Sequence, residues 1–439
     1  MVDRNAILLY TKFKTEHMFN NISDFFSIGG EKMEKTILHC DLNNFFASVE
    51  CRDHPEYAGH PVAVCGSAED RHGIVLAKNE QAKKFGVKTA EPIWQAQRKC
   101  PGLVLASPHF DRYLAASRQV RELYLRFTDQ VEPFGIDECW LDVTGSRRLF
   151  GTGFEIAEHL RALVKQEVGL TISVGVSFNK IFAKLASDLK KPDATTVITQ
   201  ENFKQKIWSL PANYLLGVGR ATDKQLWSMG ITTIGELAQT EEKYLTAALG
   251  KAGQELWTNA NGLNRSPVQV EDENEPPKSV GNSITCVHDL QTEEEVWHVF
   301  LYLAEKISRR MRAANLVASG IQISVKDNLL HVEQHQLQLE WPTRLSRNLA
   351  ENARELFRNG YNWRHPVRAL GICAISLLSD NCACQASFFH NTALDERLET
   401  LETNVEAVCG KFGKGAVVRA SLMNGIPVPR ETSKNKGNQ

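Results

Sequence analysis

Three carboxylate side chains lie where the sequence predicts a folded interior. Asp41 closes an apolar run that starts at Ile37 and predicts a short buried strand. Asp137 and Glu138 are adjacent acids between apolar neighbours, in a segment that predicts two strands around a tight corner. Two neighbouring buried acids repel each other, and a divalent cation is the natural compensation. Three carboxylates on two strands therefore match a site that transfers phosphoryl groups with two metal ions.

Each of these acids also has a purely structural interpretation. Asp41 could cap the helix predicted to begin at Phe45, although Asn43 or Asn44 could cap it equally well. The acidic corner could be the solvated tip of a hairpin. Taken singly, each feature is weak evidence, and only their combination indicates a metal site.

The composition sets the frame for these residues. The chain has 439 residues, enough for about three domains. Its hydrophobic fraction of 42% and charged fraction of 23% exclude wholesale disorder. With 51 basic and 52 acidic residues the net charge is −1, so any nucleic-acid contact depends on local basic stretches or backbone amides. No apolar run is long enough to span a membrane. The ten cysteines are scattered and form no C-x-x-C pair, which indicates a reducing, cytoplasmic compartment.

The predicted elements fall into three regions after Met33. Strands and helices alternate to about residue 199, and residues 203–263 are predicted to be helical. An acidic, proline-containing stretch at 271–277 indicates a linker. Residues 280–378 then predict the order β-α-β-β-α-β, which we interpret as a separate domain. One charged helix is expected from residue 394 to about 408, and the sequence suggests no chemistry for it.

The first 32 residues differ from the rest of the chain. They have neither a sustained helical or strand period nor the layout of a signal peptide. The sequence Gly29–Lys32 could be encoded by a purine-rich stretch like a bacterial ribosome-binding site. We expect residues 1–32 to be a non-native or disordered extension, with translation starting at Met33. A peptide from this segment in mass spectra of the native protein would contradict that expectation.

Two motifs around the acids resemble a known family. Asp41–Glu50 and Gly135–Val143 are similar to the two signature motifs of the Y-family, translesion DNA polymerases. The resemblance runs from Met33 to about residue 423, and several ordered motifs are far more specific than one. Three further segments share it, namely Lys83–Val87, Val174–Lys180 and Leu216–Gly219.

The resemblance implies an α+β, multidomain right-hand polymerase. It implies a palm, fingers, a helical thumb with a helix-hairpin-helix, and a β-α-β-β-α-β little finger. The expected limits are 33–51 and 110–199 for the palm, 52–109 for the fingers, 200–265 for the thumb, 266–278 for a linker, 279–380 for the little finger and 381–439 for a tail.

The family likeness assigns catalytic roles to the acids. Asp41 and Asp137 would hold two Mg²⁺ ions, and Glu138 would join them at the ion that activates the primer 3′-hydroxyl. Leu42 would lend its backbone carbonyl to the nucleotide-side ion. The implied reaction adds a deoxynucleotide to a primer opposite a DNA template by in-line displacement. Low fidelity and the lack of proofreading are likewise implied by the family.

Three more residues acquire roles in nucleotide binding from the resemblance. Phe46 would be a steric gate, whose ring leaves no room for a 2′-hydroxyl. Lys191 and Lys83 match positions that contact the triphosphate. Without the family, Phe46 would be interpreted as a core residue, as we expect for its neighbour Phe45. The two lysines would be interpreted as solvated.

The chain departs from the family pattern near the predicted fingers. Glu80 stands where the family has a tyrosine, and its charge opposes a phosphate. Lys83 replaces an arginine, and Gly135 replaces a serine before the acids. Leu76 is larger than the residues frequent at its place above the new base pair. We therefore expect a tighter roof that is less tolerant of bulky adducts, and a Leu76→Ala variant that bypasses such lesions no better would contradict it.

Two further motifs imply macromolecular partners. Gly217 and Gly219 resemble a helix-hairpin-helix that meets DNA phosphates with backbone amides, although a plain helical turn is the alternative. Gln385, Phe388 and Phe389 resemble the short peptide that binds the bacterial sliding clamp. Aromatic residues in an otherwise polar tail support that interpretation.

The sequence leaves several functional alternatives open. A catalytically silent scaffold for DNA and clamp should have lost the acids, which are all present. A nucleotide cyclase would need no grip on duplex DNA. A polymerase V catalytic subunit would need partner proteins. The favoured prediction is a monomeric polymerase acting on primer-template DNA and deoxynucleoside triphosphates.

Overall fold

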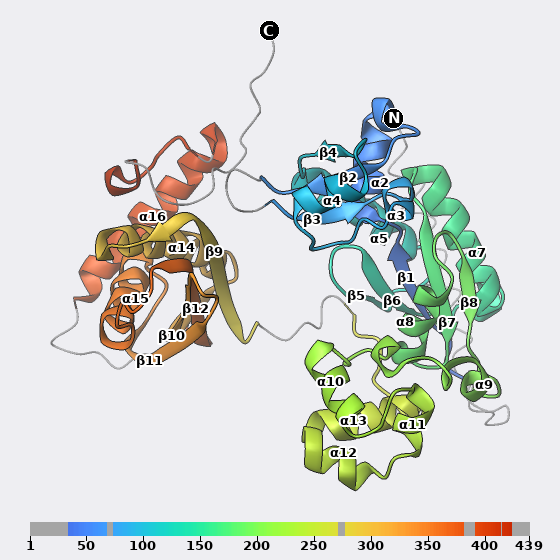
Figure 1. The fold of residues 1–439 in the computed structure, drawn as a ribbon. Helices are drawn as coiled ribbons and strands as arrows, with labels where there is room; N and C mark the ends of the chain where they lie inside the picture. Colours follow the sequence, from blue (N-terminus) through green and yellow to red (C-terminus); the bar gives the residue numbers. More distant parts are fainter. Residues whose placement is uncertain (1–33, 68–72, 271–276, 382–390, 414, 424–439) are drawn as a thin grey trace, which may run out of the picture. The chain divides into compact units, whose positions relative to one another are not determined.

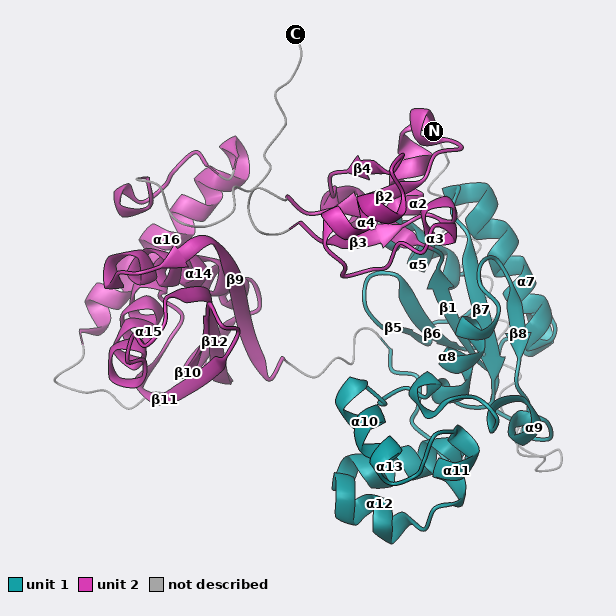
Figure 2. Ribbon diagram, viewed as in Figure 1, with its two compact units in different colours: residues 1–43, 116–271 teal, residues 44–115, 272–439 magenta. Residues whose placement is uncertain are grey.

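The computed structural model describes residues 34–67, 73–270, 277–381, 391–413 and 415–423 (Figure 1). It divides into two compact units (Figure 2). The first contains residues 1–43 and 116–271, and the second contains residues 44–115 and 272–439. Residues 1–32 and the predicted clamp peptide lie outside the described residues, so those two predictions stay untested by the structure.

A five-stranded sheet is the centre of the first unit. β1 lies in the middle, antiparallel to both of its neighbours, and all of its residues are buried. A strand covered on both faces reads as a continuous apolar run, which is why the sequence predicted it. The strand order is β5 (Val131–Pro133), β6 (Glu138–Asp142), β1 (Ile37–Leu42), β7 (Ile172–Ser177) and β8 (Thr195–Val197).

Helix α8 (Lys180–Leu189) packs directly against β1 and β7. The Asn179 side chain caps it by accepting a hydrogen bond from the Phe182 amide at 2.8 Å. Gly175 in β7 permits an unusually close approach, because a Cβ there would lie 1.9 Å from the Ala183 carbonyl oxygen. The other helices of this region are α6 (Arg147–Phe150) and α7 (Gly153–Leu163), which continues as a π-helical turn, η2 (Val164–Val168). Helix α5 (Phe110–Tyr124) belongs to the second unit up to residue 115 and to the first unit from residue 116.

The rest of the first unit is helical, as predicted for residues 203–263. Its core joins Leu226, Leu237 and Leu245 to Phe182 of α8, all of them fully buried. The elements are α9 (Phe203–Ile207), η3 (Ala212–Tyr214), α10 (Arg220–Ser228), α11 (Ile234–Gln239), α12 (Glu242–Leu249) and α13 (Lys251–Ala260).

The N-terminal part of the second unit has a three-stranded sheet, in the order β3 (Val75–Lys78), β2 (Val62–Cys65) and β4 (Val104–Ala106). Its helices are α2 (Phe45–Asp53), η1 (Pro55–Tyr57), α3 (Glu80–Lys84) and α4 (Ile93–Lys99). The expected side-chain cap of α2 is wrong. Asn44 occupies the N-cap position with a left-handed backbone (φ 50°), and its side chain makes no capping bond. Its amide instead donates to Glu80 at 2.9 Å.

The C-terminal part of the second unit has the predicted order β-α-β-β-α-β. The elements are β9 (Ser279–Leu290), α14 (Glu293–Ala313), β10 (Leu316–Asp327), β11 (Val332–Thr343), α15 (Ser346–Gly360) and β12 (Val367–Ser379). The sheet order is β11-β10-β12-β9, and every neighbouring pair is antiparallel. Alternate residues of β10 are buried, which is why a period of two predicted it.

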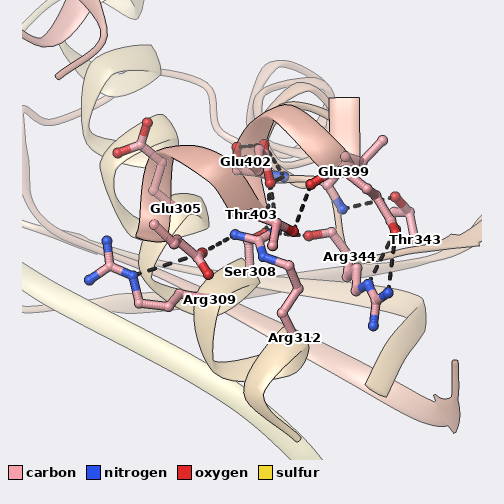
Figure 3. Close-up of polar contacts among 12 residues, drawn as sticks. Glu305, Ser308, Arg309, Arg312, Thr343, Arg344, Glu399, Glu402 and Thr403 are labelled. Carbon is pink, nitrogen blue, oxygen red and sulfur yellow. Dashed lines mark hydrogen bonds and ion pairs between the residues drawn. The ribbon is translucent and has the colours of Figure 1, made fainter. Parts of the chain in front are cut away.

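The charged helix predicted near residue 394 is α16 (Thr392–Phe412), and it docks on this domain through ion pairs (Figure 3). Glu402 lies 2.6 Å from Arg312, and both side chains are nearly buried. Arg312 also pairs with Glu406. Arg419 contacts Glu305 at 2.5 Å and Glu402 at 3.1 Å. After α16, the turn η5 (Ala420–Leu422) places Leu422 in the apolar core of the domain.

Glu402→Ala is expected to release α16 from the domain. The change removes one ion-pair partner of the nearly buried Arg312 guanidinium, which lowers the stability of the docked helix by about 3 kcal/mol. Amide hydrogen exchange in α16 of the full chain should accelerate about 100-fold. The matched control is Arg347→Ala, which breaks the exposed pair with Glu351 and should leave exchange unchanged. Equal exchange in the two variants would show that the ion pairs do not hold the helix.

None of the helices in the described ranges has the length and apolarity needed to cross a membrane. Among the cysteines that the structure describes, no disulfide forms.

Candidate active site

The three predicted acids meet at one end of the two central strands. Asp41 of β1 lies directly opposite Glu138, the first residue of β6. Opposite residues of an antiparallel pair point to the same face. The Asp137 carbonyl accepts a hydrogen bond from the Leu42 amide at 3.0 Å, which fixes the corner against β1. The structure therefore brings together residues that lie about a hundred positions apart in the sequence.

The corner before β6 depends on Gly135. Its φ is +90°, a conformation that side-chain-bearing residues rarely adopt. This gives a physical reason for glycine where the family has serine. Ser117 of α5 donates its hydroxyl to the Ile136 carbonyl, which ties the corner to the helix.

Two lysines enter the acid cluster. Lys191 Nζ lies 2.6 Å from Asp41 Oδ2 and 2.7 Å from Asp188. Lys184 Nζ lies 2.8 Å from Glu138 Oε2 and 3.6 Å from Asp41 Oδ2. Lys191 was predicted as a contact to the triphosphate, but its pairing with Asp41 was not predicted, and Lys184 was missed altogether. Its helical spacing of four from Asp188 was the available signal.

Burial shapes the ionisation of the acids. It raises the pKa of Asp41 to about 6, against the opposing effect of Lys191. Burial also raises the pKa of Asp137, and the negative charge of Glu138 adds to this effect. Burial alone would raise the pKa of Glu138, but hydrogen bonds from His39 and Lys184 lower it to about 2. The cluster therefore holds negative charge that needs cations.

The donor set fits Mg²⁺. Hard divalent ions prefer carboxylate and carbonyl oxygens, which Asp41, Asp137, Glu138 and the Leu42 backbone can supply. Within the described residues, no three His, Cys, Asp or Glu side chains already surround a common point. Lysine amines contact the oxygens of Asp41 and Glu138 that an ion would use. Ammonium groups and metal ions therefore compete for the same carboxylates.

Phe46 lies in the second unit, on a platform of aromatic rings. Its ring stacks on Tyr113 with centroids 4.3 Å apart and an interplanar angle of 11°. Tyr113 donates its hydroxyl to the buried Glu50 at 2.5 Å. Phe45 is buried, as expected of a core residue, while Phe46 is only partly buried. One face of the Phe46 ring is thus fixed by stacking.

Lys83, the other predicted triphosphate residue, also belongs to the second unit. It is half exposed and lies 3.5 Å from Glu80. Glu80 in turn accepts the hydrogen bond from Asn44. The unusual glutamate is therefore partly neutralised by its own neighbours. Leu76 packs beside Phe46 against the apolar cluster that contains Ala47 and Val62.

The predicted glycines lie immediately before α10. Gly217 has a positive φ of 98°, and Gly219 is the N-cap residue of the helix. No side chain caps the first turn of α10 at this position. Its first amides are oriented as donors, an arrangement that suits an anion.

Family models match most of the chain. The model of the impB/mucB/samB family matches residues 40–188, and the model of its C-terminal domain matches residues 277–388. The thumb-domain model of DNA polymerase-iota matches residues 213–264. A DNA polymerase IV from Acetivibrio thermocellus is 48% identical over 391 residues, which cover 89% of this chain and 98% of that protein. The chain belongs to the DNA polymerase IV group of the Y family.

A second curated relative and a solved structure are also similar to this Y-family polymerase. DNA polymerase IV 1 of Bacillus subtilis is 35% identical over 92% of this chain and 95% of its own. A solved Y-family polymerase chimera has a TM-score of 0.71 over 78% of this chain and 99% of its own. At 24% identity, that likeness supports the fold alone.

Membership confirms two predictions, the multidomain α+β polymerase fold and a translesion DNA-directed DNA polymerase. It decides against the cyclase, the silent scaffold and the polymerase V subunit. The family uses Mg²⁺, in agreement with the oxygen donors of this Y-family polymerase.

Proposed function

We propose that Asp41, Asp137 and Glu138, with the Leu42 carbonyl, hold two Mg²⁺ ions while a deoxynucleotide is added to a primer 3′ end. The observation that carries the proposal is the meeting of Asp41 and Glu138 around Lys184, with Asp137 at the adjoining corner. Bound there, one ion would lower the pKa of the 3′-hydroxyl and the other would offset charge on the triphosphate.

The chain's own lysines complete the electrostatics of this site. Lys191 and Lys184 balance the carboxylates in the metal-free protein. Once ions bind the acids, the Lys191 ammonium can serve the triphosphate as a point charge. Lys83 is the second proposed contact to the triphosphate, and its pairing with Glu80 would weaken that contact.

Lys191→Gln is expected to raise the KM for deoxynucleotides about 30-fold, which corresponds to about 2 kcal/mol. The loss is that of one charge-assisted hydrogen bond to the triphosphate. Steady-state primer extension at saturating DNA measures it. Lys190→Gln, at the exposed neighbouring position, is the control and should keep the wild-type KM. Equal KM values for both variants would remove Lys191 from the nucleotide site.

The proposed catalytic residues all fall within the segments that we assign to the palm. We assign residues 33–51 and 110–199 to the palm, 52–109 to the fingers, 200–265 to the thumb and 279–380 to the little finger. The amides at Gly217 and Gly219 would approach a phosphate of the primer-template.

We propose that this polymerase acts as a monomer, with low fidelity and without proofreading. Sedimentation with and without DNA tests whether the polymerase is a monomer. Degradation of a mismatched primer end would refute the lack of proofreading.

We also propose that Gln385, Phe388 and Phe389 bind the sliding clamp. In the sequence these residues follow β12 and precede α16. Arg344 joins the two flanking segments, since it pairs with Asp380, just after β12, at 2.9 Å and with Glu399 of α16 at 3.1 Å.

The double variant Phe388→Ala and Phe389→Ala is expected to abolish clamp-stimulated processivity, because two aromatic anchors are lost. Extension without clamp should remain at the wild-type rate. Primer extension on a long template, with and without clamp, provides both readings. Undiminished stimulation of the variant would refute the assignment.

A further inference from the structure

His39 is a fully buried histidine beside the acid cluster. It lies on β1 and is 0% exposed. Its Nε2 is 3.1 Å from Glu138 Oε2, and its Nδ1 is 2.9 Å from the Ser187 hydroxyl oxygen. Trp140 packs edge-on against the ring at 5.3 Å between centroids. The imidazole therefore has a fixed orientation, with one polar partner on each side.

The approach of α8 to the sheet makes this contact possible. A Cβ at residue 175 would lie 2.5 Å from the Ser187 backbone nitrogen and 2.9 Å from Ala186 Cβ. Glycine at this position lets the helix settle against β7. Ser187, 1% exposed, then reaches across to β1.

Counting hydrogens assigns the tautomer of His39. An ionised Glu138 only accepts, so Nε2 must carry a hydrogen to bind Oε2. When Nε2 carries the only ring hydrogen, Nδ1 is an acceptor and takes the single hydroxyl hydrogen of Ser187.

Ser187 has an alternative acceptor. Its hydroxyl lies 2.7 Å from the Lys184 carbonyl oxygen. If it donated there, Nδ1 would have to donate to the Ser187 oxygen, and a ring with its only hydrogen on Nδ1 would turn a lone pair toward Glu138. The direction of the Ser187 hydroxyl is therefore coupled to the choice of the ring nitrogen that carries the hydrogen.

We propose that Ser187 and His39 form a positioning pair that holds Glu138 by one oxygen for Mg²⁺ binding at the primer side. His39 and Lys184, at 2.8 Å, both reach Oε2, so the carboxylate is anchored along one edge. The proposal rests on the proposed function of Glu138. Hydrogen bonds of this kind orient a metal ligand and set its basicity.

The direct test is the nitrogen NMR signature of His39 in the full chain, assigned with a His39→Gln variant. We expect Nε2 to carry the hydrogen in the metal-free protein. Ser187→Ala should shift the ring toward the Nδ1–H form, since the donor to Nδ1 is gone. A wild-type ring with the hydrogen on Nδ1 would overturn the proposal.

Kinetics supplies a second test. Ser187→Ala and His39→Asn are expected to raise the half-saturating Mg²⁺ concentration about tenfold and to lower kcat, with less than about a twofold change in the KM for nucleotide. His39→Gln, whose amide nitrogen can replace Nε2, should recover most of both losses.

The control for the serine is Ser177→Ala. Ser177 is also buried, and its hydroxyl donates to the Ile198 carbonyl at 2.9 Å. Wild-type Mg²⁺ dependence in Ser187→Ala, with Asp137→Asn inactive, would refute the positioning pair alone. Retained activity in Asp137→Asn would instead refute the proposed catalytic site.

Discussion

Asp137→Asn is expected to lower kcat/KM for primer extension at least ~1,000-fold, a loss of about 4 kcal/mol of transition-state stabilisation. Asparagine keeps the shape of the side chain but removes a charged ligand that the proposal gives to both ions. Primer extension with purified protein, Mg²⁺ and an undamaged template measures the loss. DNA binding should persist, because the residue takes no part in the proposed grip on the duplex.

Asp142→Asn is the matched control. Asp142 is the last residue of β6, the strand that follows Asp137, and its Oδ1 accepts hydrogen bonds from the Thr144 amide at 2.9 Å and hydroxyl at 2.5 Å. Asparagine can still accept these bonds, so the variant should extend primers normally. Comparable activity in the two variants would contradict the assignment of Asp137.

Asp137→Asn should also stabilise the metal-free protein against unfolding. Burial, and then the charge of Glu138, raise the pKa of Asp137, so its ionised form is disfavoured in the folded state. A neutral asparagine removes that penalty at neutral pH. Thermal unfolding in the presence of a chelator should therefore show a higher midpoint for Asp137→Asn than for wild type.

Phe46→Val is expected to reduce discrimination against ribonucleotides about 100-fold, or about 3 kcal/mol. The smaller side chain leaves room for a 2′-hydroxyl that the phenyl ring would exclude. The stacking of Phe46 on Tyr113 limits the freedom of the ring to move aside. The ratio of kcat/KM for each deoxynucleotide and its ribonucleotide provides the measurement.

Phe45→Leu serves as the control for the gate. Phe45 is 3% exposed and packs in the core beside Phe46. Its replacement should lower stability but leave the sugar discrimination unchanged. If both variants changed the ratio alike, loosened packing and not the gate would explain the effect.

Some parts of this protein could be predicted from local sequence patterns. The burial of β1 is visible in the sequence as a continuous apolar run. The burial of β10 is visible as an alternation of residue types with a period of two. The six-element order of residues 279–379 follows from such periods. The motifs that carry the family likeness are short and contiguous, so one sequence was enough to recognise them. By contrast, β4 has three residues, too few to display any period.

Other parts needed the tertiary structure. The side chain of Asn44 does not cap α2, because its amide finds Glu80 instead. Helix α16 docks on its domain because Glu402 pairs with Arg312, 90 residues away in the sequence. No periodicity reports which charged residues will pair across such a distance.

Apolar runs and short motifs were enough to predict the three acids, the strands at which they lie and the family. What surrounds the acids depends on the tertiary structure. Lys184 and Ser187 reach the cluster because Gly175 lets α8 approach β7. His39 contacts Ser187 across 148 positions. Burial and helical spacing are local properties that one chain segment records, whereas hydrogen-bond partners are fixed by the packing of segments against each other.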